Sequence, residues 1–446
     1  MMQNVEKIAL VGAGLVGSLM AIYLAKRGYK VDLYERRRDM RKGSADAGRS
    51  INLALSNRGL RPLKEVGLNE AAKKMVIPMQ GRMMHDHKGS LTFQPYGRLG
   101  QAINSISRGG LNELLMNEAE KLGVKIHFDH LCTGIDFEKN LLSFDVNGKE
   151  IEQSADIIIG SDGAFSVVRG FMQRTDRFNF SQYYIEHGYK ELSIPPAPNN
   201  GFKIDKNALH IWPRGNYMLI ALPNLDGSFT VTLFFPFNGQ PSFDTLQTRD
   251  DVEQFFKEVF PDAYELMPTL ADDFQTNPTS SLVTVKSYPW VKNKTLIIGD
   301  ASHAIVPFYG QGMNSGFEDC RILNALLDQH QDNWDVVLQK FNETRKPDVD
   351  AISDLALQNF IEMRDLVADE DFLLRKKIEA RLHELYPEKW TPLYSMVTFN
   401  EDIRYSEALN IGRRQKEIMD EVMRSPDIEN TWEELDFKNI VEKLEV

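Results

Sequence analysis

The segment Lys7-Ile-Ala-Leu-Val11-Gly12-Ala-Gly14-Leu-Val-Gly17 decides the fold class of this chain. Residues 7–11 form a short apolar run, which is typical of a parallel strand buried on both faces. Glycines follow the run, and residues 15–27 then have the composition of a helix that ends at Gly28. Residues 31–34 are again typical of a strand. The segment therefore predicts a strand, a helix and a second strand in succession.

The three glycines have the spacing of a turn that binds a dinucleotide. Gly12 allows the tight turn, Gly14 lets the backbone approach a pyrophosphate, and Gly17 allows close packing of helix against strand. The helix N-terminus beyond them offers free N–H groups and the positive end of its dipole to the phosphates. Glu35 stands at the end of the second strand, where a carboxylate can accept hydrogen bonds from ribose hydroxyls. This pattern predicts a Rossmann-like unit without distinguishing NAD from FAD.

Composition excludes several broad classes of protein. The 446-residue chain has 52 basic and 64 acidic residues and a net charge of −12, which argues against nucleic acid or an anionic membrane as its main partner. The two cysteines, Cys132 and Cys320, lie far apart in the sequence, which argues against a Cys₄ or Cys₂His₂ zinc site. No apolar run approaches the roughly 18–20 residues of a membrane helix, and the polar N-terminus is unlike a signal peptide. We expect a cytoplasmic protein with reduced thiols and no membrane anchor.

Periodicity divides the rest of the chain into regions of different character. The first region continues as α/β structure, with a helix expected at 112–122 and strands at 124–128 and 156–159. Antiparallel strands separated by turn residues are expected at 208–212, 217–222 and 229–235. Another short strand at 295–298 returns to the α/β type, and charged, helix-compatible segments follow, with breaks expected at Pro347, Pro387 and Pro392.

These patterns predict an α/β plus antiparallel-β protein. A Rossmann-like dinucleotide-binding domain is expected to be interleaved with an antiparallel-sheet substrate domain and followed by C-terminal helices. The expected bounds are 1–178 and 286–345 for the Rossmann-like domain, with about 76–105 contributing to the substrate side, 179–285 for the antiparallel sheet, and 346–446 for the helical region.

Two later segments bear on the identity of the dinucleotide. Gly160-Ser-Asp162-Gly163 and Gly299-Asp300-Ala-Ser-His303 each follow a buried-strand pattern. With the N-terminal glycines, their order and spacing resemble the three signatures of the single-component aromatic hydroxylases that use flavin. The resemblance implies FAD as cofactor, with NADPH as a transient co-substrate and O₂ as oxidant. The positions that match cofactor contacts in that family are Gly12, Gly14, Gly17, Glu35, Ala54, Arg108, Asp300, Gly312, Met313 and Asn314.

A narrower resemblance runs from residue 5 to about residue 415. Gly81-Arg82-Met, Gln94-Pro-Tyr96-Gly and Tyr394-Ser-Met-Val-Thr-Phe399 look like segments of the bacterial members that hydroxylate L-kynurenine to 3-hydroxykynurenine. In that family the reaction passes through a flavin C4a-hydroperoxide, so the resemblance assigns no catalytic side chain. It implies substrate contacts from Arg82, Tyr96, Asn359 and Tyr394 at the amino-acid carboxylate. It implies an aromatic-ring pocket lined by Ile220, Leu222, Phe234, Phe308, Tyr309 and Met363.

Some features leave alternatives open. Many relatives carry His where this chain has Tyr309, so hydrogen bonding beside the pocket is expected to differ there. Arg82 would serve equally for another aromatic acid, such as a salicylate- or hydroxybenzoate-like substrate, because a guanidinium reads only the carboxylate. A flavin-bearing redox sensor without oxygenase activity is the alternative from a different class. His85-Asp-His87 suggests no third ligand, so we expect no metal, and no oligomeric state follows from the sequence.

Overall fold

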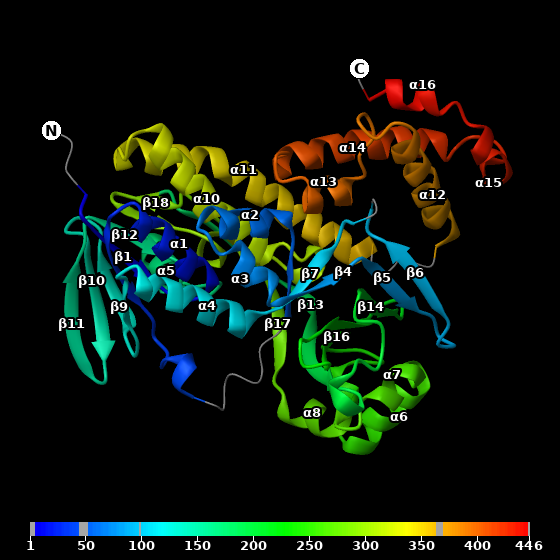
Figure 1. The fold of residues 1–446 in the computed structure, drawn as a ribbon, viewed down its shortest axis with the longest axis horizontal. Helices are drawn as coiled ribbons and strands as arrows, with labels where there is room; N and C mark the ends of the chain where they lie inside the picture. The colour runs from blue at the N-terminus through cyan, green and yellow to red at the C-terminus, as the bar shows by residue number, and fades with distance from the viewer. Residues whose placement is uncertain (1–4, 44–51, 98–99, 363–368, 445–446) are drawn as a thin grey trace.

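The computed structural model describes residues 5–43, 52–97, 100–362 and 369–444 (Figure 1). Its first layer is a six-stranded sheet in the order β18-β19-β12-β1-β2-β8. All neighbouring strands are parallel except β18 with β19. The strands are β1 (Lys7–Val11), β2 (Lys30–Tyr34), β8 (Lys125–His127), β12 (Ile157–Gly160), β18 (Val291–Lys292) and β19 (Thr295–Ile297). This sheet confirms the predicted Rossmann-like unit.

Helices cover this sheet and bury it. The N-terminal glycines are followed by α1 (Leu15–Lys26), which contacts both α4 (Arg108–Lys121) and α10 (Gly312–Gln329). Every residue of α1 from Gly17 to Leu24 is buried, because neighbours on all sides leave the helix no solvent-facing stripe. The helix predicted at 112–122 begins four residues earlier, since the side chain of Ser107 caps it by accepting from the backbone N–H of Gly110.

The second large layer is a seven-stranded sheet in the order β17-β13-β16-β15-β14-β5-β6. Its neighbours are antiparallel except β14 with β5, as the sequence predicted for its central part. The strands are β5 (Gly81–His85), β6 (Leu91–Pro95), β13 (Asn179–Ile194), β14 (Ala208–Pro213), β15 (Met218–Pro223), β16 (Phe229–Pro236) and β17 (Thr279–Tyr288). Strands β5 and β6 come from the first part of the chain, so the two layers are interleaved in sequence.

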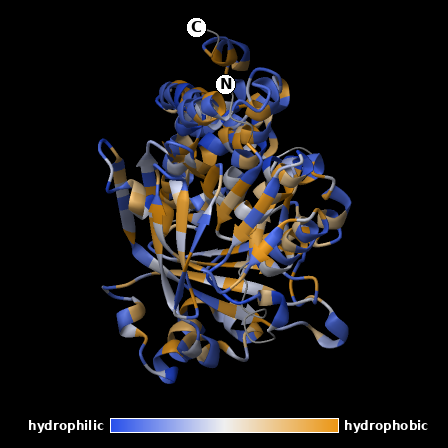
Figure 2. Ribbon diagram, turned by 90° about the vertical axis from the view of Figure 1, so that its left-hand side faces the viewer, coloured by the Kyte–Doolittle hydropathy of each residue, from blue (hydrophilic) through white to orange (hydrophobic). Residues whose placement is uncertain are grey.

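Small helices cover one face of this second sheet. A separate hydrophobic core joins β16 to α6 (Arg249–Val259), α7 (Pro261–Leu266) and α8 (Leu270–Thr276). Every residue of β16 is buried, because both faces of this central strand are covered. The colouring of Figure 2 shows the hydrophobic residues gathered along the strands, inside the layers.

Two three-stranded sheets flank the large ones. The first, in the order β11-β10-β9, lies at one end of the molecule (left in Figure 1). The second, in the order β3-β7-β4, connects the two layers. The strands are β9 (Leu131–Asp136), β10 (Leu141–Val146), β11 (Lys149–Ser154), β3 (Asn52–Leu55), β4 (Val76–Met79) and β7 (Ile103–Ser107).

Helices complete the fold at the C-terminal side. The long helix α11 (Trp334–Ile361) continues through Pro347, so the break expected at that residue is wrong. Buried ion pairs of Arg345 and Asp348 on either side of the proline hold the helix together there. The domain bound expected at 345 thus falls inside a continuous helix. The remaining helices of this region are α12 (Glu370–Leu385), α13 (Leu393–Phe399), α14 (Tyr405–Val422), α15 (Ile428–Thr431) and α16 (Phe437–Glu442).

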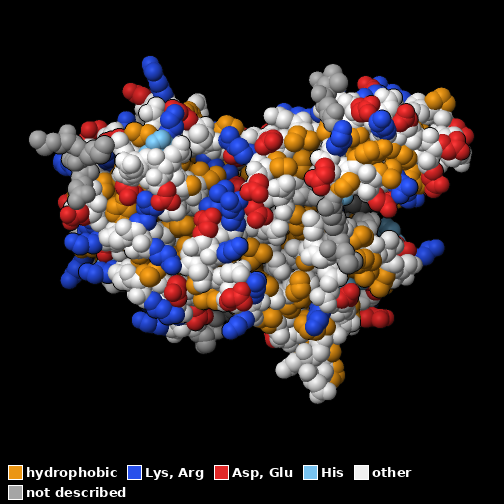
Figure 3. All heavy atoms as spheres, turned by 45° about the horizontal axis from the view of Figure 1, so that its top comes forward, with side chains coloured by type: hydrophobic (Ala, Val, Ile, Leu, Met, Phe, Trp, Pro, Cys, Tyr) orange, Lys and Arg blue, Asp and Glu red, His pale blue; other side chains and the backbone are white. Residues whose placement is uncertain are grey.

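The surface carries charges of both signs. On the face drawn in Figure 3, Lys and Arg side chains are interspersed with Asp and Glu. Among the described residues, no helix combines the length and the apolar character needed to cross a membrane.

Candidate active site

The glycine turn after β1 is shaped for close approach. Gly12 has φ of 104°, and a Cβ at Gly17 would lie 2.0 Å from the backbone oxygen of Gly12, so neither position accepts a side chain. A Cβ at Gly14 would meet nothing within 4 Å, which leaves open space beside the first turn of α1. No side chain caps this helix at Gly14. Its first N–H groups are therefore available to an anionic group such as a pyrophosphate.

Glu35, the acidic residue at the end of β2, is tied into the same turn. Its Oε2 accepts from the backbone N–H of Ala13 at 3.1 Å, and its Oε1 accepts from Arg37 Nε at 3.0 Å. The carboxylate is 8% exposed and retains lone pairs that are free to accept from a ribose. Glu35 therefore shapes the glycine turn as well as offering an acceptor beside it.

Arg169, at the end of the second signature, joins that signature to the third, a contact that the sequence did not predict. Ser166 caps α5 (Val167–Met172), and Asp162 accepts from the backbone N–H of Val167 in the first turn at 2.7 Å. Arg169 on that helix donates to the backbone oxygens of Ala164 at 2.6 Å and of Ala301 at 2.8 Å. The arginine thus fixes the loop after β12 against α9 (Asp300–His303), the short helix of the third signature.

Asp300 begins α9 directly after Gly299, whose φ of 59° with ψ of −145° is accessible only to glycine. Asp300 is exposed to solvent, but many protein atoms lie close to its carboxylate and displace part of its hydration. Loss of hydration raises the pKa of the Asp300 carboxyl, and the neighbouring His303 and Arg108 act in the opposite direction. Arg108 is exposed at the start of α4. An acceptor held in this way fits the hydroxyl groups of a ribityl chain.

The N-terminus of α10 supplies backbone rather than side-chain groups. Asn314 donates from Nδ2 to the oxygens of Ala54 at 2.8 Å and Gly310 at 2.7 Å, and its Oδ1 accepts from the N–H of Ser56. The side chain of Asn314 is therefore committed to holding β3 against α10. Gly312 and Met313 are partly buried at the start of the helix, so any contact with a flavin ring from these residues falls to their backbone or to the Met313 side chain. Taken together, these groups fit FAD.

Three of the four predicted substrate residues form one cluster. The guanidinium of Arg82 on β5 lies 4.8 Å from the ring centre of Tyr394 and 5.6 Å from that of Tyr96. The two tyrosine rings stack with centroids 5.6 Å apart, and Tyr309 stacks on the other side of Tyr394 at 5.2 Å. Burial raises the pKa of Tyr96 and of Tyr309, so both phenols stay protonated.

Two buried polar atoms in this cluster lack a partner. Nε of Arg82 and the hydroxyl oxygen of Tyr96 are shielded from solvent and have no hydrogen-bond partner among the described residues. Buried polar groups in proteins are nearly always satisfied, so such a pair of donors indicates a place for an acceptor from outside the chain. A carboxylate can accept from both groups.

Asn359, the fourth predicted substrate residue, contacts the neighbouring segment. Its Nδ2 donates to the backbone oxygen of Phe308 at 2.6 Å, from α11 to the turn η4 (Pro307–Tyr309). Phe308 in turn stacks on Phe360 at 4.3 Å and lies 5.0 Å from the ring of Phe234. Asn359 therefore orients the aromatic wall between the tyrosine cluster and α10.

The predicted pocket residues form the apolar surroundings of the cluster. Leu222 packs in a small core with Tyr96 and Phe399, and Ile220 and Tyr394 pack against that core from its edge. Phe234, Phe308 and Tyr309 belong to the main core, which continues to the Rossmann-like layer. Ala54 lies in the same small core, next to Gly310 at the expected flavin ring. Met363 lies outside the described residues.

His85, the first histidine of the His-x-His pattern, is part of a buried hydrogen-bond chain. Its Nδ1 contacts Asp262 Oδ2 at 2.7 Å, and its Nε2 contacts Nδ1 of His210 at 2.8 Å. His210 Nε2 contacts the backbone oxygen of Asp205 at 2.8 Å. The ring of His85 stacks on Trp212. Over the described ranges, no three His, Cys, Asp or Glu side chains group as metal ligands would.

The sequence matches known flavoproteins over nearly its whole length. A family model described as an FAD binding domain matches residues 6–356. The chain is 51% identical over 441 residues to a Cytophaga hutchinsonii protein named kynurenine 3-monooxygenase, covering 98% of each chain. A Dictyostelium discoideum protein of the same name is 45% identical over 437 residues, covering 95% of this chain and 94% of its own.

Solved structures of lower identity share the fold. The tetrameric form of 2-methyl-3-hydroxypyridine-5-carboxylic acid oxygenase superposes with a TM-score of 0.67 at 20% identity, over 82% of this chain and 94% of its own. A probable FAD-dependent monooxygenase from Pseudomonas aeruginosa, pqsL, gives a TM-score of 0.66 at 16% identity, over 81% and 97%. At these identities the likeness describes architecture: a Rossmann-like layer interleaved with an antiparallel sheet.

Proposed function

This chain belongs to the FAD-binding family of kynurenine 3-monooxygenases, and we propose that it hydroxylates L-kynurenine to 3-hydroxykynurenine with FAD, NADPH and O₂. The observation that carries the proposal within the structure is the pair of unpartnered buried donors, Arg82 Nε and the Tyr96 hydroxyl. They lie among apolar and aromatic side chains, where we expect an amino-acid carboxylate to bind with its ring against those side chains.

The proposed division of labour follows from the residues around the pocket. FAD, when bound, supplies the activation of O₂ for transfer to the ring. Arg82 binds the substrate carboxylate through its planar fork of N–H groups, and Tyr96 donates a further hydrogen bond from its phenol. Phe234, Phe308 and Leu222 exclude water from the reacting ring. The amino group of the substrate already enriches its ring in electrons, so orientation is the main task of the protein.

The cofactor residues and the domains are part of the same proposal. The α1 N-terminus would hold the pyrophosphate, Asp300 the ribityl chain, and the backbone from Gly312 to Asn314 the flavin ring. The Rossmann-like regions 1–178 and 286–345 would form the FAD domain. The sheet at 179–285, with part of 76–105, would form the substrate domain, and residues 346–446 would close the site from the helical side.

One reaction tests the activity. Purified protein carrying FAD is incubated with kynurenine, NADPH and air, and the product is identified by mass spectrometry. We expect a product heavier by one oxygen atom, with NADPH oxidation stimulated by kynurenine more than by salicylate or 4-hydroxybenzoate. Greater stimulation by a benzoate, with its hydroxylated product, would favour the other aromatic acids. Stoichiometric H₂O₂ without any organic product would favour a redox sensor.

A further inference from the structure

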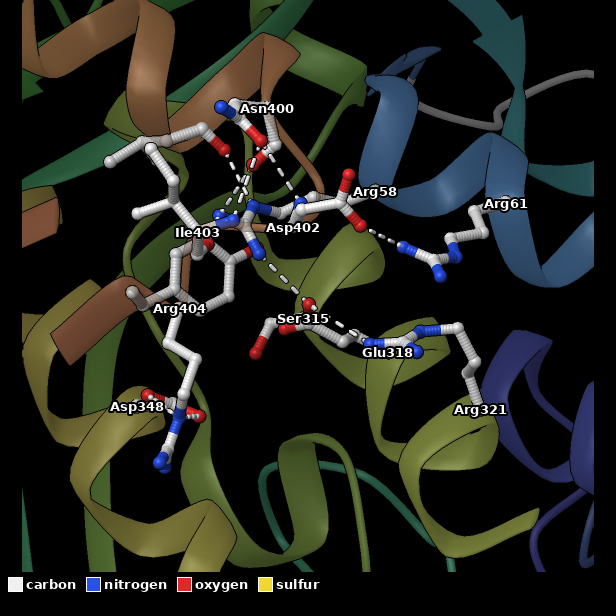
Figure 4. Close-up of polar contacts among 12 residues, drawn as sticks. Arg58, Arg61, Ser315, Glu318, Arg321, Asp348, Asn400, Asp402, Ile403 and Arg404 are labelled. Carbon is white, nitrogen blue, oxygen red and sulfur yellow. Dashed lines mark hydrogen bonds and ion pairs between the residues drawn. The ribbon is translucent and has the colours of Figure 1, made fainter. Parts of the chain in front are cut away.

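A buried arginine far from Tyr394 in the sequence holds the helix that carries Tyr394. Arg58 lies in α2 (Asn57–Glu65) and is 2% exposed. Its Nε donates to the backbone oxygen of Val397 at 2.7 Å, and its Nη2 donates to that of Asn400 at 2.9 Å. The same Nη2 also contacts the backbone oxygens of Met396 and Ile403. Figure 4 shows this guanidinium pointing into the turn that contains Asn400 and Ile403.

Two of these acceptors, Met396 and Val397, belong to the last turn of a short helix, and Asn400 and Ile403 lie in the turn that follows it. Helix α13 (Leu393–Phe399) is seven residues long, and its last carbonyl groups have no partners within the helix. A guanidinium at this end satisfies them and complements the negative end of the helix dipole. Asn57 adds a neutral contact, donating from Nδ2 to the backbone oxygen of Phe399 at 3.0 Å. The start of α2 therefore grips the end of α13 through two side chains.

The position of α13 decides where the ring of Tyr394 lies. Tyr394 is the second residue of this helix and lies two and three residues before Met396 and Val397, two of the four residues whose carbonyls Arg58 contacts. Its ring stacks between Tyr96 and Tyr309 and faces the guanidinium of Arg82. A shift of α13 along its axis would therefore move one wall of the proposed carboxylate site.

Arg58 is itself fixed by a buried chain of ion pairs. Its Nη1 donates to Glu318 Oε1 at 2.9 Å, and Glu318 Oε2 lies 2.7 Å from Nη1 of Arg345. Arg345 Nε donates to Asp319 Oδ1 at 2.7 Å. Asp319 Oδ2 then accepts from the backbone N–H of Gly299 at 2.9 Å. The chain thus runs from the end of α13 to the turn that presents Asp300.

We propose that Arg58 is a positioning residue for substrate binding, which acts by fixing α13 so that Tyr394 completes the carboxylate site with Arg82. The proposal rests on the function proposed above. The proposal differs from a purely structural role for Arg58, because it requires the effect of Arg58 on kynurenine binding to depend on the side chain of Tyr394.

A double-mutant cycle tests this route. Arg58→Lys keeps a positive charge beside Glu318 but replaces the planar fork with a single ammonium group, which cannot reach the same carbonyls together. We expect Arg58→Lys to weaken kynurenine binding about tenfold, the value of roughly one lost hydrogen bond, while the flavin content stays that of the wild type. In a Tyr394→Ala background the same change should cost less than about twofold. Binding is measured from the kynurenine-induced change in flavin absorbance.

Two further variants keep the test decisive. Arg61→Gln is the matched control: Arg61 lies one turn along α2 and pairs with the side chain of Asp402 at 2.8 Å, so kynurenine binding should not change. Asn57→Ala removes the neutral contact to Phe399 and replaces Arg58→Lys in the test if that variant fails to fold. We expect it to weaken kynurenine binding about threefold, and we expect this effect to disappear in the Tyr394→Ala background.

The outcomes separate this inference from the proposed function. Equal effects of Arg58→Lys, or of Asn57→Ala, with and without the Tyr394 side chain would overturn the inference. Weaker kynurenine binding in Arg61→Gln would also overturn it, because the effect would then belong to α2 as a whole. A wild-type protein whose flavin spectrum and NADPH oxidation do not respond to kynurenine would instead refute the proposed function.

Discussion

Replacing Arg82 with Met should separate substrate recognition from folding. The guanidinium gains two ring contacts, with Tyr96 and Tyr394, each worth about 0.5–1 kcal/mol. Against them stands a buried Nε without a partner among the described residues, which costs about 1–3 kcal/mol. The terms nearly cancel, so Arg82→Met should change the free energy of unfolding by less than about 1 kcal/mol. The thioether side chain fills a similar space without a charge.

The same substitution should strongly impair the reaction. Leaving a buried carboxylate without its charged partner costs about 2–5 kcal/mol, which corresponds to a loss of kcat/KM between about 30-fold and several thousand-fold. Three measurements on wild type and variant suffice: flavin content by absorbance, unfolding by urea, and kcat/KM from the hydroxylated product. Flavin content should not change.

A substrate analogue identifies the substrate group that Arg82 binds. The amide of kynurenine lacks the negative charge, so the wild type should strongly prefer the acid, and the variant should discriminate little between acid and amide. The reasoning is refuted if Arg82→Met loses more than about 2 kcal/mol of stability while keeping the preference for the acid, since the residue would then be structural.

Three other predictions concern the cofactor turn, Asp300 and the buried histidine chain. Gly14→Ala should fold but bind FAD more weakly, because its methyl group meets open space in the protein and would crowd the phosphates. In Gly17→Ala the Cβ would lie 2.0 Å from a backbone oxygen, so this variant should lose both fold stability and FAD. Thermal unfolding and flavin fluorescence measure the two effects. Asp300→Ala should weaken FAD binding about tenfold or more, because a charged acceptor is lost, and titration of the apoprotein with FAD measures this. The stability of the apoprotein against urea should stay the same or increase, because burial raises the pKa of this carboxyl. Burial lowers the pKa of His210 from 6.5 to about 4, so unfolding takes up a proton between these values, and stability that is present above pH 6.5 is lost as the pH falls toward 4. The loss from pH 7 to pH 5 should be about 2 kcal/mol for this residue, and His210→Gln should flatten the pH dependence of urea unfolding by that amount.

The sequence predicted those parts of the site whose residue type is dictated by backbone shape or charge. Gly12 and Gly17 are recognisable because no other residue fits a positive φ or a 2.0 Å approach. The family resemblance then brought Arg82, Tyr96 and Tyr394 into the prediction, and the structure places these three side chains together.

The sequence could not predict the contacts whose acceptors are backbone carbonyl groups. Arg58 holds four carbonyls of residues 396–403, and Asn314 holds those of Ala54 and Gly310. Every residue has a carbonyl, so no residue type marks the partner. For the same reason, the assignment of Asn314 as a flavin contact did not anticipate that its side chain is already engaged. Pro347 is the opposite case. Its residue type predicts a break, but ion pairs from Arg345 to Glu318 and from Asp348 to Arg404 fix α11 on both sides of the proline, and the helix stays continuous.

The buried ion chain from Arg58 to Asp319 has a cost that stability alone does not explain. Each charge in it is less than 5% exposed, and replacing such a network with apolar side chains of similar volume is often neutral or stabilising. An apolar core, however, has no directional contacts, and α13 could then settle at several positions along its axis. Charge-assisted hydrogen bonds fix direction as well as distance. Since one end of the chain holds the helix of Tyr394 and the other holds the turn of Asp300, the network fixes the distance between the proposed carboxylate site and the proposed flavin site. A hydroxylation that depends on the position of one ring carbon requires that separation to be constant.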